Sequence, residues 1–382
     1  MERKGIKVRY AVIGLGHIAQ VAVLPAFAHA RRNSELVALA SDDPVKLAKL
    51  SRRYRAKLRC DYAGLDELYA SGEIDAVYIA LPNAMHEEHT LRAARAGLHV
   101  LCEKPMADSA AACERMIAAT RDRGVRLMIA YRLHFERATL EALALARPSA
   151  RSRNGRGRAK LGDLRFFSSE FSMQVRDNPT RLDRDLGGGP LQDIGIYCIN
   201  AARAIFAAEP IEVTAVAATR GDGEQFSEVP ATVSALLRFP DERLAAFTCS
   251  FDAADRSVYT IVGTEGSVTV EPAYEYAEGL AYQVRIGNRK RHKKFSKSDQ
   301  FAPELLHFSD CVLRGEDPEP SGEEGLADVR VIEALERSIE KGKPVPLGDA
   351  PPDVQRPSLA QEKRRPPVGK PQLVHARPPH PS

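Results

Sequence analysis

The chain has 382 residues, of which 44% are hydrophobic and 28% are charged, and its formal net charge is +4. This length exceeds what a single hydrophobic core usually organises, so it predicts two domains in an ordinary water-soluble globular protein. The small net charge argues against a nucleic-acid partner, and no apolar run approaches the roughly 18 residues that a membrane span requires.

The cysteines and the start of the chain suggest the compartment. The six cysteines are scattered, without the spacing of a metal site. We therefore expect free thiols in a reducing environment, with no disulfide framework and no bound metal. An apolar strand begins within a few residues of Met1, with no separate signal segment, so we expect a cytoplasmic protein.

A glycine-rich turn follows this first strand. The sequence GLGHIA begins at Gly14 and leads into a helical pattern, an order typical of dinucleotide-binding folds. Gly14 would permit the tight turn, Gly16 would let the backbone approach a pyrophosphate, and Ala19 would let helix and strand pack closely. The amides of His17 and Ile18 would then face the pyrophosphate from the helix N-terminus. A plain tight turn is the alternative.

Short strands and helices alternate over the next hundred residues. Because alternation of this kind is typical of a parallel, doubly wound sheet with right-handed crossovers, we predict an α/β Rossmann domain over residues 1–132. The expected strands are 8–13, 35–41, 75–81, 99–105 and 125–131, and the expected helices between them include 45–54, 86–97 and 109–124.

The residues after the second strand bear on the choice of nucleotide. Asp42 would bond a ribose 2′-hydroxyl and so favours NAD, whereas Ser41 and Lys46 would bind the 2′-phosphate of NADP. The sequence leaves both open, with NADP slightly favoured. Ser41, Asp42 or Asp43 is alternatively the N-cap of the following helix.

Two further motifs carry polar side chains to places where chemistry is expected. Glu103 and Lys104 end the fourth strand, at the sheet edge where open α/β sheets bind ligands, and the following proline permits a cis peptide. A solvated lysine is the alternative. In GGGPLQDIGIYCIN, expected to be helical over 187–206, Asp193 and Tyr197 are four residues apart and therefore share one face. Such a pair is either a polar bridge or part of a catalytic site.

After about residue 160, strands follow one another with few helices between them. This order predicts an α+β domain over residues 133–348, built on an open-faced, mainly antiparallel sheet. Helices at 187–206, 303–313 and 323–341 are expected to cover one face. The other face is expected to form the contact of a homodimer or homotetramer, since an uncovered apolar sheet face marks an interface.

Five motifs together resemble the Gfo/Idh/MocA oxidoreductase family, and most of all its glucose–fructose branch: GLGHIAQ, ALPNAMHEEH, CEKPMA, GGGPLQDIGIY and GEEGLADVRVIEAL. The resemblance implies an NAD(P)-dependent enzyme acting on a sugar or related polyol. It implies that Lys104, Asp193 and Tyr197 are catalytic, with Tyr197 as acid/base assisted by Lys104. A non-catalytic, nucleotide-bound sensor or scaffold remains the alternative.

The same resemblance extends, more loosely, to residues around the cofactor and substrate. It places Leu81, Pro82, Asn83 and His86 near the nicotinamide ribose, although His86 fits a helix cap equally well. Tyr131 and Arg132 would border the pocket, with Arg132 counted as cofactor-binding together with Glu103 and Lys104. Arg181 would bind substrate with Lys104, Asp193 and Tyr197. The chain has Thr180 where relatives often have tryptophan, which leaves the sugar unidentified.

Three segments depart from the family pattern. The basic stretches 146–164 and 289–294 lack aromatic partners for stacking bases, so we expect a solvated loop and an exposed hairpin tip rather than nucleic-acid contacts. The proline-rich tail 349–382 has little apolar material, which predicts disorder or an extended path along a partner subunit.

Overall fold

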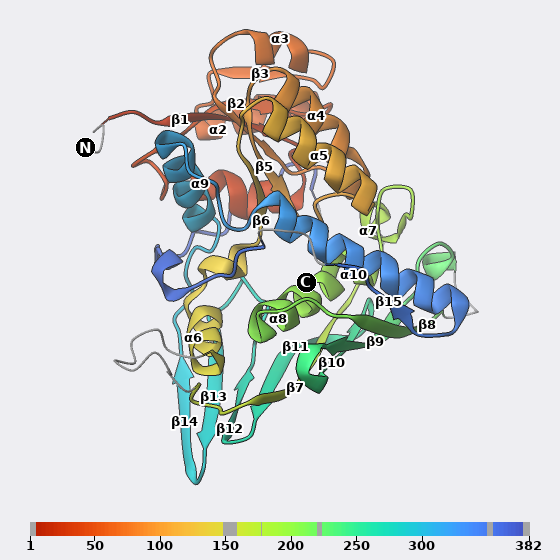
Figure 1. Ribbon diagram of the computed structural model, residues 1–382. Helices are drawn as coiled ribbons and strands as arrows, with labels where there is room; N and C mark the ends of the chain where they lie inside the picture. The colour runs from red at the N-terminus through yellow and green to blue at the C-terminus, as the bar shows by residue number, and fades with distance from the viewer. Residues whose placement is uncertain (1–4, 148–158, 177, 220–223, 350–353, 377–382) are drawn as a thin grey trace.

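The structure is a computed structural model that describes residues 5–147, 159–176, 178–219, 224–349 and 354–376. Most of the basic stretch 146–164 therefore lies outside the described residues. The N-terminal domain is a six-stranded parallel sheet in the order β3-β2-β1-β4-β5-β6, which confirms the predicted Rossmann fold (Figure 1). Its strands are β1 (Val8–Ile13), β2 (Ser34–Ala40), β3 (Leu58–Cys60), β4 (Ala76–Ile79), β5 (His99–Glu103) and β6 (Leu127–Ala130).

Helices flank this sheet largely where the sequence predicts them. They are η1 (Ala19–Val23), α1 (Leu24–Ala26), α2 (Pro44–Tyr54), α3 (Leu65–Ala70), η2 (Asn83–Met85), α4 (His86–Arg95) and α5 (Ala110–Asp122). Strand β3 and helix α3 are not among the predicted elements. Strand β3 has only three residues, too few to show the alternation by which a strand is recognised.

The C-terminal domain is built on a nine-stranded sheet in the order β14-β13-β12-β11-β7-β10-β9-β8-β15. Only the central β7–β10 pair is parallel, so the described sheet is mainly antiparallel as predicted. The strands are β7 (Leu164–Gln174), β8 (Glu212–Ala218), β9 (Thr232–Phe239), β10 (Arg243–Ser250), β11 (Asp252–Gly263), β12 (Gly266–Val270), β13 (Ala281–Ile286), β14 (Arg289–Lys294) and β15 (Val345–Pro346). The basic run 289–294 is thus the edge strand β14 itself, and not a hairpin tip.

One face of the nine-stranded sheet carries helices α6 (Arg137–Ala146), α8 (Ile196–Phe206) and α10 (Gly322–Lys341), as Figure 1 shows. On the opposite face of the central strands, large apolar side chains remain 43–67% exposed in this single chain: Phe166, Val216, Leu236 and Leu244. This is the open apolar face that the sequence predicts.

Helix α9 (Ala302–Arg314) contradicts the prediction that it packs on the C-terminal sheet. It returns to the N-terminal domain, where Leu305, Leu306 and Phe308 are fully buried in the same apolar cluster as Tyr10. The Tyr10 hydroxyl lies 2.7 Å from the Ser309 hydroxyl. The apolar pattern of α9 specified that one face is buried, but not which sheet buries it.

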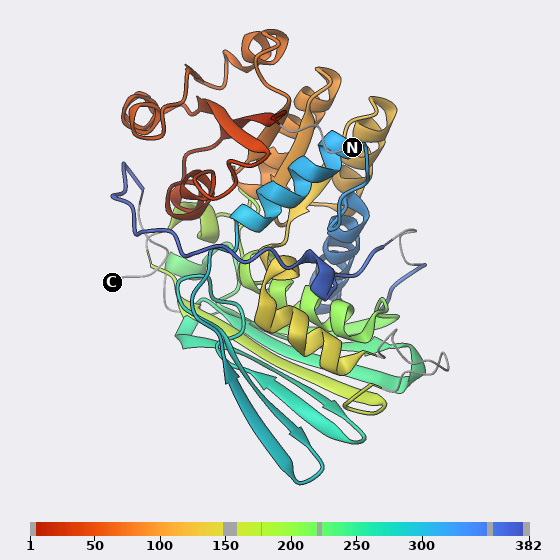
Figure 2. The same cartoon turned by 90° about the vertical axis from the view of Figure 1, so that its left-hand side faces the viewer.

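The tail also contradicts its prediction. Residues 354–376 follow a defined path along their own chain, so the predicted disorder does not hold for this part of the tail. They form an extended segment, with one short helix η7 (Leu359–Gln361), that runs across the boundary between the two domains (Figure 2). Many of its contacts are polar, which is why apolar content alone did not predict its order.

All six cysteines are free thiols. No helix in the described ranges is both long and apolar enough to span a bilayer. Within the same ranges, no group of three or more histidine, cysteine or acidic side chains is arranged to hold a metal ion.

Candidate active site

The glycine-rich turn fits a bound pyrophosphate. Gly14 has a φ of +91°, and a Cβ there would clash with the backbone of Ala80 on the neighbouring strand. A Cβ on Gly16 would meet nothing within 4 Å, so the chain leaves open space beside this backbone. The helix that follows starts directly after this turn, with a π-type turn over Ala19–Val23, and free amides at a helix N-terminus favour bound phosphate. The residues present thus fit the phosphates of a dinucleotide.

The corner after β2 is held by a capping residue. Asp43 is the N-cap of α2 and accepts hydrogen bonds from the amides of Val45 and Lys46, so the capping alternative holds for this residue. Ser41 is buried, and its hydroxyl accepts a hydrogen bond from the Asp43 amide. The exposed Asp42 accepts one from the amide of Tyr62.

Lys104 and Asp193 meet across the domain boundary. The Lys104–Pro105 peptide is cis. The Lys104 ammonium donates to the backbone carbonyl of Asp193 at 2.8 Å and to its carboxylate at 3.2 Å. Arg181, in the short helix α7 (Pro179–Leu182), lies 3.1 Å from the second carboxylate oxygen of Asp193. The three side chains are 12–23% exposed, so the cluster is largely desolvated yet reachable.

The helix bearing Asp193 and Tyr197 begins later than predicted. The three glycines form a turn, and a π-type turn over Leu191–Gly195 precedes α8. Gly187 has a φ of +77°, and a Cβ there would lie 2.7 Å from the Cβ of Asn83. Asn83 donates a 2.6 Å hydrogen bond to the Gly187 carbonyl. The turn thus needs glycine because the two domains touch here.

Tyr197 lies between two cations. The Lys104 ammonium is 4.9 Å and the Arg132 guanidinium 5.0 Å from the centre of its ring. Burial disfavours the charged form of Lys104, but Tyr197 and Asp193 outweigh it and raise the pKa of Lys104. Arg132 behaves in the same way, with burial opposed chiefly by Tyr197. Both groups therefore stay cationic beside the Tyr197 ring.

Arg132 is buried and is held by residues that follow β12. Its guanidinium donates to Gln300 and to the carbonyl of Tyr274, and it also lies 5.2 Å from the ring centre of Tyr276. Sequence reasoning missed Tyr276 and Gln300, because neither belongs to a motif. Only the return of the chain to the domain boundary after β12 brings them here.

Two buried carboxyl groups, Glu103 and Glu304, lie near the cations Lys104 and Arg132. Glu103 accepts a 2.8 Å hydrogen bond from Tyr78, and burial raises its pKa. Glu304, on α9, is fully buried, and neither of its oxygens has a hydrogen-bond partner among the described residues. Burial, reinforced by Glu103, raises the pKa of Glu304 well above its usual range, so we expect it to be neutral.

His86 connects two of the predicted cofactor loops. It is fully buried, and its ring nitrogens lie 2.9 Å from the carbonyls of Leu81 and Pro105. The first carbonyl belongs to the loop after β4 and the second follows Lys104. His86 is the first residue of α4, as the helix-start alternative expects, and its side chain holds the two loops together.

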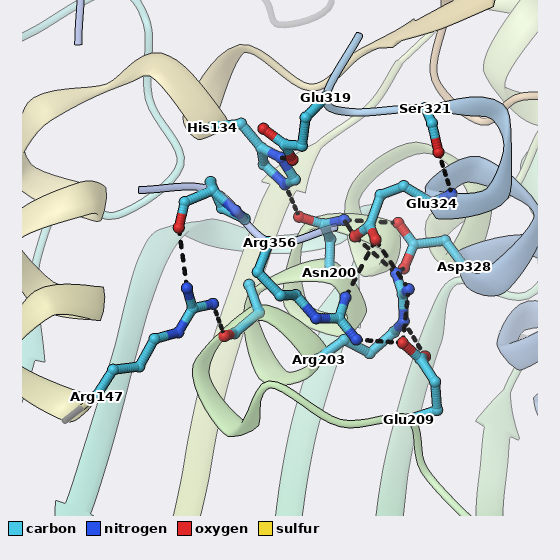
Figure 3. A network of polar contacts seen from close by, with 12 residues as sticks. His134, Arg147, Asn200, Arg203, Glu209, Glu319, Ser321, Glu324, Asp328 and Arg356 are labelled. Atoms are coloured by element: carbon cyan, nitrogen blue, oxygen red, sulfur yellow. Dashed lines mark hydrogen bonds and ion pairs between the residues drawn. The ribbon is translucent and has the colours of Figure 1, made fainter. Parts of the chain in front are cut away.

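A buried polar network supports the helix that carries Tyr197 (Figure 3). Asn200 and Arg203, one and two turns along α8, both contact Glu324 and Asp328 of α10. Asn200 also bonds His134, which in turn lies 2.6 Å from Glu319. Arg356 of the tail closes the network by contacting Glu324 and Glu209. These contacts fix the rotation and position of α8.

The comparisons with known proteins agree with this architecture. Residues 8–131 match the GFO/IDH/MocA oxidoreductase family, NAD-binding Rossmann fold, and residues 157–269 match a GFO/IDH/MocA C-terminal domain. D-xylose 1-dehydrogenase [NADP(+)] from Haloarcula marismortui is 31% identical over 89% of this chain and 93% of that protein.

Solved structures extend the comparison. Aldose-aldose oxidoreductase from Caulobacter crescentus, complexed with glycerol, is 36% identical with a TM-score of 0.82, covering 89% of this chain and 100% of that one. KijD10, a 3-ketoreductase from Actinomadura kijaniata solved with NADP and TDP-benzene, is 26% identical with a TM-score of 0.76, over 87% of this chain and 98% of that one. This chain belongs to the GFO/IDH/MocA family of oxidoreductases.

Proposed function

We propose that the protein is an NADP-dependent oxidoreductase that transfers a hydride between the nicotinamide and a carbon of a sugar or related polyol. The observation that carries the proposal is the cluster of Lys104, Asp193 and Tyr197, in which the Lys104 ammonium bonds Asp193 and lies against the Tyr197 ring. It lies at the carboxyl ends of the parallel strands, where α/β sheets bind their ligands.

The bound nicotinamide supplies the acceptor or donor of the hydride, and the chain supplies the proton chemistry. In the oxidation direction, the Tyr197 phenolate takes the proton of the substrate hydroxyl, and in reduction the phenol returns it. Lys104 and Arg132 remain cationic and stabilise negative charge on the two oxygens as the proton moves.

Asp193 and Arg181 orient the substrate. Asp193 bridges the ammonium of Lys104 and the guanidinium of Arg181. A polyol has neighbouring hydroxyl groups that both donate and accept hydrogen bonds. An ionised carboxylate accepts such bonds and the two cations donate them. The site therefore suits a substrate with several adjacent hydroxyls better than a simple alcohol.

NADP is the cofactor that we propose for this chain, with the glycine turn binding its pyrophosphate through the amides of His17 and Ile18. Ser41 and Lys46 remain our proposed contacts on the 2′-phosphate. Asp43 is already occupied as an N-cap, which leaves it less suited to bond a ribose hydroxyl. The relatives named for NADP support this choice. Leu81, Pro82, Asn83 and Glu103 remain our proposed contacts on the nicotinamide side.

We also propose a homodimer or homotetramer in a cytoplasmic setting. The exposed apolar face formed by strands β7, β8, β9 and β10 supports the assembly, since contiguous apolar surface of this kind is typical of protein–protein contacts. Size-exclusion chromatography with light scattering tests this proposal, and a monomer at micromolar concentration would contradict it.

The first test of the function is the nucleotide itself. The purified protein is denatured, any released nicotinamide nucleotide is identified by mass, and binding of NADPH and NADH is titrated by fluorescence. A panel of aldoses and polyols is then offered while absorbance at the nicotinamide band is followed. We expect tighter binding of NADPH and turnover of at least one sugar. Binding without turnover of any sugar or polyol favours the non-catalytic sensor, and binding of neither nucleotide rejects the proposal.

A further inference from the structure

The tail is attached at its beginning to the network beneath the catalytic helix. Arg356 is 15% exposed and pairs with Glu324 and Glu209, both of which also bind Arg203 of α8. Arg147 donates a 2.9 Å hydrogen bond to the carbonyl of Pro357 (Figure 3). The start of the tail is thus fixed to the C-terminal domain.

The middle of the tail crosses to the N-terminal domain. Gln361 bonds Glu319, and Lys363 lies 3.3 Å from Asp310 on α9. Arg365 then pairs its backbone carbonyl with the amide of Asp299. These contacts follow one another in chain order, so the segment is guided along a continuous path across the domain boundary (Figure 2).

The end of the described tail is built into the cofactor domain. Gln20, in η1, is fully buried, and its amide group bonds both the N–H and the carbonyl of Val374 at 2.8 Å. The same Gln20 side chain bonds the carbonyl of Leu15 in the glycine-rich turn. Val374 is only 5% exposed and belongs to the apolar core of the N-terminal domain.

Beyond Val374 the tail reaches the turn between β2 and α2, where the proposed function places the adenosine ribose. This turn is called the ribose corner below. His375 places a ring nitrogen 2.9 Å from the carboxylate of Asp43. Arg53, at the other end of α2, donates a 2.6 Å hydrogen bond to the carbonyl of Gln372. Residues 372–375 therefore run along α2 towards its N-terminus. Ser41 precedes this end of α2 and Lys46 lies in its first turn, and both bind the 2′-phosphate in the proposed function.

We propose that residues 372–375 are part of the cofactor site, where they form a wall beside the glycine-rich turn and place His375 against Asp43 at the adenosine ribose. This inference rests on the proposed function. The contact with the His375 ring gives the Asp43 carboxylate a partner where it would otherwise face a 2′-phosphate. The wall slows dissociation of the nucleotide, and His375 shifts preference from NADH towards NADPH.

Charge and order both support this assignment. The amide of Lys46, and after it His375, hold the pKa of Asp43 below its usual range, so the carboxylate is ionised and its charge must be balanced when a phosphate binds. Fixing an extended segment costs conformational entropy, which the anchors at Arg356, Gln361 and Gln20 offset before the nucleotide arrives. The wall is therefore preorganised.

The test compares the full chain with a chain ending at Lys370, which keeps the anchors at Arg356 and Gln361 and removes the wall. NADPH is bound, chased with excess NADP, and its dissociation is followed by fluorescence. We expect the truncation to raise the dissociation rate by about tenfold or more. His375→Ala is expected to weaken NADPH by about fivefold and NADH by less than about twofold. Lys363→Ala, a tail contact far from the ribose corner, is the matched control and is expected to change neither.

Two outcomes overturn the inference. Equal dissociation rates for the truncated and full chains, within about twofold, show that the segment does not belong to the site. Equal weakening of NADPH and NADH by His375→Ala removes its part in selecting the nucleotide. Val374→Asp detaches the wall without shortening the chain and decides the matter should the truncated protein not fold. A full-length chain that binds neither nucleotide instead rejects the proposed function on which the inference rests.

Discussion

The glycine-rich turn and the catalytic cluster reach their geometries by different routes. The turn is local: Gly14 and Gly16 lie within three residues, and Gly14 combines a positive φ with a close approach to the neighbouring strand. The cluster is assembled from Lys104 on one domain, Asp193 and Tyr197 on the other, and Arg132 between them. A local site depends on backbone sterics, whereas an assembled site depends on whatever holds its elements in register.

The strongest way to break the assembled site is to remove its support. Arg203→Met leaves Glu324, Asp328 and Glu209 buried without their main cation. Breaking one side of a buried ion network costs about 3–5 kcal/mol of unfolding free energy. Urea unfolding of the cofactor-free protein measures the loss. Arg330→Met, on the exposed side of α10, is the matched control and is expected to cost less than about 0.5 kcal/mol.

Removing the phenol tests the cluster without touching its support. Tyr197→Phe deletes the proton-transferring oxygen while keeping the ring between Lys104 and Arg132. We expect turnover to fall by about 100-fold or more, with nucleotide affinity unchanged, because general acid–base catalysis contributes on that scale. Steady-state kinetics and a fluorescence titration check the two quantities. Unchanged turnover would contradict the role proposed for Tyr197.

The local site is broken by a single methyl group. Gly14→Ala forces a side chain into a φ of +91° and against Ala80, for an expected loss of about 1–3 kcal/mol of stability together with weaker nucleotide binding. Gly72→Ala is the comparison, since Gly72 also has a positive φ, of +71°, but open space around it. Thermal unfolding and nucleotide titration separate strain, which both variants share, from the clash. Equal effects of the two variants would reject the clash.

The smallest expected effect is a dependence of stability on pH within the supporting network. Burial lowers the pKa of His134, but Glu319 outweighs it and raises the pKa above its usual value. This pair stabilises the fold below the ordinary histidine pKa of about 6.5, and the stabilisation is lost as pH rises through the raised value. We expect His134→Asn to flatten the fall in melting temperature between about pH 6 and pH 9. If His134→Asn leaves the dependence of melting temperature on pH unchanged, another titrating group is responsible for it.

Motif and periodicity predicted much of the molecule. Strand–glycine–helix order identified the Rossmann domain, and runs of alternating strands identified the second sheet. The motifs at Lys104, Asp193 and Tyr197 named three residues that do lie together. Tyr276, Gln300 and Glu304 escaped because each joins the site only through contacts far along the chain, and single residues outside a motif carry no signal of their partners.

The sequence by itself determined most of the strands and helices, because hydrophobic periodicity and capping act over a few residues. It also placed the glycine turn, since that conformation depends on the residues that adopt it. Only the tertiary structure decided that α9 packs on the first domain, that Arg132 lies against Tyr197, and that the tail reaches Asp43. Those contacts join residues far apart in the chain, and their free energy comes from burial and charge pairing that exist only after both partners have folded.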